Sequence, residues 1–248
     1  MNDLSGRNTV VVGASRGLGR GIAREFAEAG APVVAVARSA PALAELASTS
    51  ANIRTEVADA TDATEAWSLL DRYEPEVLVL VAGANPVMRP LQHQTWETFS
   101  ANWHADVRIA FTWLREVLLQ PLPPGSRMIV VSSGAAINGS PASGGYAGAK
   151  ATQRFIAAYA QDESSRAGLG ITVTSVMPSM TPHGDVGRRG VRAYAARSGQ
   201  PERVFLEQLG EPLTSKTAGS ALVDLVKADP ATVAREYLLT ATGLEKLM

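Results

Sequence analysis

Cysteine is missing from this 248-residue sequence, and its absence excludes disulfides and thiolate chemistry. Histidine is scarce: His93, His104 and His183 lack the spacing of metal ligands, so we predict no metal site. No apolar run approaches the ~18 residues that a membrane-spanning helix needs, so we expect no membrane association. Neither sign of charge predominates, since 23 lysines and arginines stand against 24 aspartates and glutamates. Without basic runs, the chain is not expected to bind nucleic acid.

What the sequence does contain is an alternation of short apolar runs and helical patterns. The strand-like runs lie near residues 8–12, 32–37, 53–57, 76–82, 127–132 and 170–176, with a weaker one near 236–241. This alternation predicts an α/β fold of three α/β/α layers around a doubly wound parallel sheet, with strand order 3-2-1-4-5-6. The length suits one domain spanning 1–248. Because the first strand begins almost at the N-terminus, we expect no signal peptide and a cytoplasmic protein.

A glycine-rich turn follows the first predicted strand. The turn reads Gly13-Ala-Ser-Arg-Gly17-Leu-Gly19 and leads into an amphipathic helical pattern. Glycines let the backbone approach a pyrophosphate, and the start of a helix offers free N–H groups. The spacing differs from the G-x-G-x-x-G fingerprint, and a glycine turn before a helix can be only a tight turn. Its place after the first strand of a strand–helix repeat favours a dinucleotide site.

The second predicted strand ends in Arg38-Ser39. A site for NAD(H) would place an acid about 20 residues beyond the glycines, and no acid is present there. Arg38, together with Arg16 of the glycine turn, would suit a 2′-phosphate through charge-assisted hydrogen bonds. We therefore predict NADP(H) in preference to NAD(H). The alternative is that Arg38 only begins a solvated helix.

A second motif joins Ser133, at the end of a predicted strand, to Tyr146 and Lys150. Residues four apart on a helix share a face, so Tyr146 and Lys150 can act together. An ammonium held close to a phenol stabilises its anion. Tyr146 is thus a candidate proton donor and acceptor for a carbonyl/alcohol pair, with Ser133 holding the substrate oxygen. The same spacing is common in surface pairs, but a nucleotide site in the same chain favours catalysis.

Together the motifs resemble the short-chain dehydrogenase/reductase family of the single-domain type, from about residue 7 to Pro178. The resemblance implies a Rossmann NAD(P)-binding domain, hydride transfer between the nicotinamide and a small carbonyl or secondary alcohol, and catalysis by Ser133, Tyr146 and Lys150. The positions it assigns to the cofactor run from the glycine turn to the sixth strand. They are Gly13, Ser15, Arg16, Gly17, Leu18, Gly19, Arg38, Asp59, Ala60, Ala82, Gly83, Tyr146, Lys150, Pro178 and Thr181.

Three positions depart from the family pattern. Leu80-Val81 replaces a usual Asn-Asn, and Pro178-Ser179 replaces Pro-Gly. Asp106 falls where the family has a catalytic Asn, with Asn102 one turn earlier on the same face. Asp106 can accept from a relay water or pair directly with Lys150. These departures leave two alternatives open: a non-catalytic NADP(H)-binding sensor or partner protein, and an isomerase or dehydratase without net redox change.

Two further regions carry expectations. Residues 179–213 are rich in glycine and arginine, and the resemblance implies a substrate lid there. Its arginines either steer an anionic substrate or form a solvated helical face paired with glutamates. Long helices are predicted near 95–120 and 146–167. In the resembled family such helices pair subunits, so we expect a homodimer or homotetramer, unless their aromatic residues pack only on their own sheet.

Overall fold

Parallel strands of β-branched residues form the centre of the computed structural model, which describes residues 4–247. Within these residues eight strands make one sheet in the order β3-β2-β1-β4-β5-β6-β7-β8. The predicted doubly wound fold and the predicted order 3-2-1-4-5-6 are confirmed. The strands are β1 (Thr9–Val12), β2 (Val33–Ala37), β3 (Ile53–Val57), β4 (Val77–Leu80), β5 (Arg127–Val131), β6 (Thr172–Pro178), β7 (Glu236–Thr240) and β8 (Gly243–Lys246).

The far edge of the sheet adds two strands beyond the six of the predicted order. The weak pattern near 236–241 is β7, which pairs with β6 in parallel. β8 was not predicted, and it returns along β7 as the antiparallel edge strand. Its four residues are half-buried or exposed and partly charged, so they carry little of the apolar pattern that indicates a strand.

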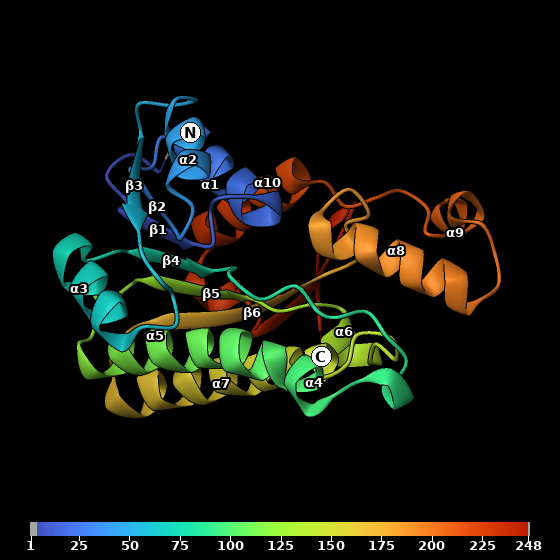
Figure 1. Cartoon of the computed structure of the whole chain (residues 1–248). Coiled ribbons are helices and arrows are strands. Elements are labelled where there is room, and N and C mark those ends of the chain that lie inside the picture. The colour runs from blue at the N-terminus through green and yellow to red at the C-terminus, as the bar shows by residue number, and fades with distance from the viewer. Residues whose placement is uncertain (1–3, 248) are drawn as a thin grey trace.

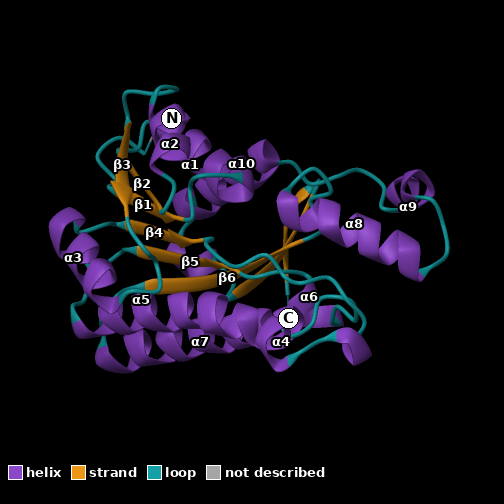
Figure 2. Ribbon diagram, in the orientation of Figure 1, coloured by secondary structure: helices purple, strands orange, loops and turns teal. Residues whose placement is uncertain are grey.

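Helices cover both faces of the sheet (Figures 1 and 2). One face packs against α1 (Gly17–Glu28), α2 (Ala40–Ala47) and α10 (Ser215–Lys227). The other packs against α3 (Ala63–Tyr73), α5 (Arg108–Leu119) and α7 (Tyr146–Ala167). Successive strand residues point to opposite faces, so Val11 joins the first core while Val10 and Val12 join the second. Because both faces are covered, the central strands read as unbroken apolar runs.

The helix predicted near 95–120 is interrupted. It consists of α4 (Trp96–Asn102), a π-helical turn η2 (Trp103–Val107) and then α5. A π turn widens the helix by one residue and is frequent at functional sites. Here Asp106 is the buried residue of the turn. The interruption therefore includes Asp106, the residue that departs from the pattern of the resembled family.

The predicted lid contains two helices, α8 (Asp185–Arg197) and α9 (Glu202–Gln208), which extend to one side of the sheet (Figure 1, orange). Arg192 Nε lies 3.5 Å from Glu202 Oε1, and Arg203 Nη1 lies 2.9 Å from Glu207 Oε1. These pairs match the interpretation of the arginines as a solvated face. The remaining short elements are α6 (Ala135–Asn138), η1 (Leu91–His93) and η3 (Pro230–Thr232).

The aromatic residues considered on the two long predicted helices are Trp103, Trp113, Phe155 and Tyr159. Of these four, only Trp113 belongs to the core, where its indole donates to Ala60 O at 2.9 Å. Trp103, Phe155 and Tyr159 are exposed. A helix of sufficient length and apolarity to cross a membrane does not occur within residues 4–247. The same residues contain no cluster of side chains suited to hold a metal ion.

Candidate active site

The carboxyl ends of β1, β4 and β5 bring the predicted site residues to one edge of the sheet. Ser133 lies just beyond β5, and its Oγ accepts from Ala135 N at 3.2 Å. Tyr146 is the first residue of α7, and Lys150 lies one turn later. The end of β5 is tied to this turn, since Ser132 Oγ donates to Lys150 O at 2.7 Å. Ser133 and Tyr146 are half-buried, whereas Lys150 is buried.

The Lys150 ammonium is surrounded by acceptors. Its Nζ lies 3.3 Å from Asp106 Oδ2, 3.0 Å from Gln153 Oε1 and 3.5 Å from Val131 O. It also lies 5.7 Å from the centre of the Tyr146 ring. Burial by itself lowers the pKa of Lys150, but the charges of Asp106 and Tyr146 outweigh it, and the pKa is raised. The amine is accordingly held as a cation beside the phenol.

Asp106 is packed as tightly as Lys150. Its Oδ1 accepts from Ala84 N at 2.7 Å, and Asn102 Nδ2 lies 3.4 Å from both carboxylate oxygens. Asn102 also donates to Ala84 O at 2.8 Å. A Cβ on Gly83 would lie 2.8 Å from Asp106 Oδ1, so only glycine fits there without a shift. Of the two roles that the sequence left open, the structure has the direct pair of Asp106 with Lys150.

Gln153 completes this cluster, and sequence reasoning missed it. Its side chain is 1% exposed, and its Nε2 donates to the main-chain carbonyl of Asp106 at 2.8 Å. The available signal was its position three residues after Lys150, which places both on one face of α7. A glutamine in a helix is more often a surface residue, so spacing alone did not distinguish it.

The glycine turn fits a dinucleotide pyrophosphate. Gly13 has φ +101 and would place a Cβ 2.5 Å from Ala82 N, so the turn lies directly against the end of β4. Gly17 has φ +54 and open space where a Cβ would be. Within the described residues, no side chain caps the first turn of α1, whose N-cap is Arg16. The backbone N–H groups of this first turn of α1 are thus free to bind an anion.

The two arginines predicted near the ribose have different surroundings. Arg16 Nη1 lies 2.9 Å from Asp185 Oδ2 on the lid, and Nη2 lies 3.5 Å from Asn85 Oδ1. Arg38 is exposed beyond β2. The amide and hydroxyl of Thr61 hold the pKa of Asp59 below its usual range, and the charges of Arg38 and Arg108 add to that effect. The charge of Arg38 is therefore felt at Asp59, whose pKa it lowers. Arg16 instead connects the glycine turn to Asp185 of α8.

The other residues predicted to contact the cofactor line the same edge. Ala82 N donates to Val12 O at 2.8 Å, and Pro178 O accepts from Gly134 N at 2.9 Å. Thr181 O accepts from Gly184 N at 3.0 Å, and a Cβ on Gly187 would lie 1.9 Å from that oxygen. Leu18 packs on the core below the turn, and Ser15 and Ala60 are half-buried.

The lid also contacts the loop between Ser133 and Tyr146, which sequence reasoning did not predict. The Tyr194 hydroxyl of α8 lies 2.6 Å from Ser140 Oγ, and Ala142 N donates to the same hydroxyl at 3.4 Å. The Tyr194 ring stacks on Phe205 of α9, with 6.3 Å between the ring centres. Both helices of the predicted lid are thereby linked to the loop between Ser133 and Tyr146.

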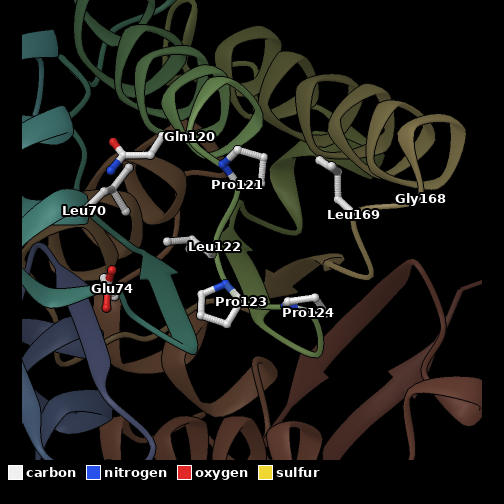
Figure 3. A pocket seen from close by; sticks show the side chains of 9 residues that line it. All are labelled: Leu70, Glu74, Gln120, Pro121, Leu122, Pro123, Pro124, Gly168 and Leu169. Atoms are coloured by element: carbon white, nitrogen blue, oxygen red, sulfur yellow. The ribbon is translucent and has the colours of Figure 1, made fainter.

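The protein also has a cavity of about 430 Å³. Figure 3 shows the side chains that line it. Its lining comes from segments that precede β4, β5 and β6, such as Glu74, Pro123 and Leu169. In a parallel sheet these segments lie at the edge opposite to Ser133 and the glycine turn. The cavity is therefore separate from the candidate active site.

Comparison with known proteins identifies the class. The model of the short chain dehydrogenase family matches residues 7–189, and the chain belongs to this family. It is similar to a hydroxynaphthalene reductase-like protein of Metarhizium majus, 31% identical over 186 residues covering 71% of this chain and 68% of the relative. It is also similar to a hydroxynaphthalene reductase of Aspergillus fumigatus, 29% identical over 222 residues, or 86% of this chain and 79% of the relative. The protein is therefore a short-chain dehydrogenase/reductase, and membership implies a nicotinamide cofactor.

Proposed function

We propose that this protein is an NADP(H)-dependent oxidoreductase that interconverts a carbonyl compound and a secondary alcohol, with Tyr146 as proton donor and acceptor. The observation that carries the proposal is the buried Lys150 ammonium beside the Tyr146 ring, 5.7 Å from its centre. It adjoins a glycine turn whose free N–H groups fit a pyrophosphate. A cation, a phenol and a nucleotide cradle at one sheet edge are the parts that the reaction needs.

When bound, the nicotinamide supplies or accepts the hydride at the carbonyl carbon. In the direction of reduction, the Ser133 hydroxyl donates a hydrogen bond to the carbonyl oxygen. Tyr146 then transfers its phenolic proton to that oxygen as the new C–H bond forms, which yields the alcohol and leaves a phenolate. The Lys150 ammonium stabilises the phenolate electrostatically. Oxidation of the alcohol runs through the same groups in reverse.

The assignment of cofactor residues follows the family resemblance. Gly13, Gly17 and Gly19, with Leu18 in the same turn, would line the pyrophosphate, and Ser15 with Arg16 the adenosine phosphate end. Asp59 and Ala60 would contact the adenine, and the segment with Ala82 and Gly83 would pass along the cofactor ribose. Pro178 and Thr181 would lie beside the nicotinamide, and Tyr146 with Lys150 at its ribose. The preference for NADP(H) rests on Arg38, an exposed guanidinium after β2 with no acid beside it in sequence. Arg16 would join it once released from Asp185.

The proposal extends to the organisation of the chain. Residues 1–248 form one nucleotide-binding domain, in which 179–213 is the lid that shields hydride transfer from water. We further propose a cytoplasmic homodimer or homotetramer. The exposed Trp103, Phe155 and Tyr159 support association, and Phe155 stacks on Tyr159, because large exposed aromatic side chains are enriched at interfaces.

The test is turnover of a panel of carbonyl compounds with NADPH and with NADH, followed by nicotinamide absorbance. Hydroxynaphthalene-type ketones belong in the panel because relatives carry that name. Tyr146→Phe should lower the rate at least about 10²-fold while NADPH still binds. Full activity of this variant would refute the proton role. Binding without turnover of any compound would favour the sensor alternative, and product without a change in absorbance the isomerase or dehydratase.

A further inference from the structure

We propose that Gln153 is a positioning residue that holds the Lys150 ammonium between Asp106 and Tyr146. This role rests on the proposed function, since it assigns Gln153 to the same site. Gln153 is 1% exposed, so its amide has no access to bulk water. A buried amide has to find its hydrogen-bond partners within the protein. Both ends of this amide find them at the site.

The two ends of the amide contact two different residues. Oε1 accepts from Lys150 Nζ at 3.0 Å, and Nε2 donates to the main-chain O of Asp106 at 2.8 Å. An uncharged side chain that both accepts and donates can make this bridge. An aliphatic side chain would leave the ammonium short of an acceptor and a buried carbonyl without a donor. The bridge fixes the side chain of Lys150 relative to the backbone of η2.

The bridge matters because Asp106 attracts the same ammonium. The oppositely charged groups of Asp106 and Lys150 are both buried, where their attraction is strongest. A direct pair drawn closer would take the cation away from the phenol. Among the acceptors of Lys150, however, Gln153 is nearer, at 3.0 Å against 3.3 Å for Asp106 Oδ2. By sharing the ammonium, Gln153 keeps it within reach of Tyr146.

The first test measures the ammonium itself and needs no substrate. The chain has four lysines, Lys150, Lys216, Lys227 and Lys246, so ¹⁵N-lysine labelling gives a simple NMR spectrum of the whole protein. We expect a slowly exchanging ammonium signal from Lys150, which Lys150→Arg would remove. In Gln153→Met, which keeps the side-chain length without the amide, exchange should accelerate about tenfold or more, as for the loss of one hydrogen bond to a charged group.

A matched control lies on the same helix. Gln161 lies eight residues beyond Gln153 and is half-buried. Its Oε1 accepts a hydrogen bond from Val173 N at 2.7 Å. Gln161→Met should leave the exchange of the Lys150 ammonium unchanged. If Gln153→Met also leaves it unchanged, or if the wild-type Lys150 exchanges as fast as the other lysines, the positioning role is wrong.

The second test uses turnover and a second variant. Gln153→Met should lower kcat by about ten- to a hundredfold with little change in the KM for the carbonyl compound. Gln153→Glu should recover activity at acid pH, where a protonated carboxyl both accepts and donates, and lose it when ionised beside Asp106. A purely steric role predicts wild-type kcat for Gln153→Met. Wild-type protein that shows the expected exchange but reduces no carbonyl would instead refute the proposed function alone.

Discussion

Lys150 Nζ lies 3.3 Å from Asp106 Oδ2, and at most 6% of either side chain is exposed. Asp106 thus pairs directly with the lysine, at the position where the resembled family has an asparagine. Two buried opposite charges are stable only as a pair, since removal of one leaves the other without a partner in a medium that solvates it poorly. The pair therefore links the stability of the fold to the site in which we propose that Tyr146 acts.

Neutralising the acid tests this coupling. Asp106→Asn should lower the free energy of unfolding by about 3 kcal/mol near neutral pH, because it leaves a buried cation without its counter-ion. The pKa of Lys150 is raised above 10.5 in the folded protein. Its contribution to stability is present below that value and is lost as the pH rises through the folded-state pKa. Urea unfolding should show a difference between wild type and variant that shrinks at alkaline pH, and a constant difference would contradict the assignment.

Gly83 is the second test of the packing around Asp106. In Gly83→Ala the added Cβ would lie 2.8 Å from a carboxylate oxygen that Ala84 N already holds. We expect a loss of about 1–3 kcal/mol in chemical unfolding, together with reduced turnover. The control is Gly148→Ala in α7, whose Cβ would meet Trp103 at an ordinary 3.6 Å. That change should be neutral or stabilise by about 0.5–1 kcal/mol. Equal stability of the two variants would show that Asp106 can move.

The fold was predictable because its signals are local. The runs of β1, β2, β4 and β5 are short, apolar and β-branched, and the glycine turn falls at a strand end. The order of the first six strands then follows from right-handed crossovers. The sequence did not predict β8, because a short edge strand need not be apolar.

The contacts within the site were less predictable because they depend on burial and on distant partners. Asp106 was identified by its place in the family pattern, and its neighbour Asn102 by helical spacing. Gln153 looks like any polar helix residue until Lys150 and the carbonyl of Asp106 are placed beside it. Arg16 and Asp185 are 169 residues apart in sequence, and no local pattern brings them together. The π turn, likewise, depends on packing that spacing does not reveal.

The cofactor preference is tested at Arg38. Arg38→Ala should weaken NADPH binding by about ten- to a hundredfold, because it removes a charge-assisted hydrogen bond to the 2′-phosphate. NADH binding should stay nearly unchanged. Fluorescence titration with both nucleotides measures the two constants. Arg54 on β3 is exposed and serves as a control, since Arg54→Ala removes an equal charge elsewhere. A parallel loss for NADPH and NADH would mean that Arg38 does not recognise the 2′-phosphate.

Association through α7 is the last expectation. Phe155 and Tyr159 are 59% and 62% exposed and stack with 6.3 Å between their ring centres, so α7 presents an apolar surface outside the core. Phe155→Arg would bury a charge in any interface formed there, and sedimentation velocity should show a monomer. Trp67→Arg on α3 changes another exposed aromatic, 49% exposed, and should leave the oligomer intact. If both variants sediment like a wild-type oligomer, or the wild type is itself monomeric, α7 does not join subunits and its aromatic surface has another role.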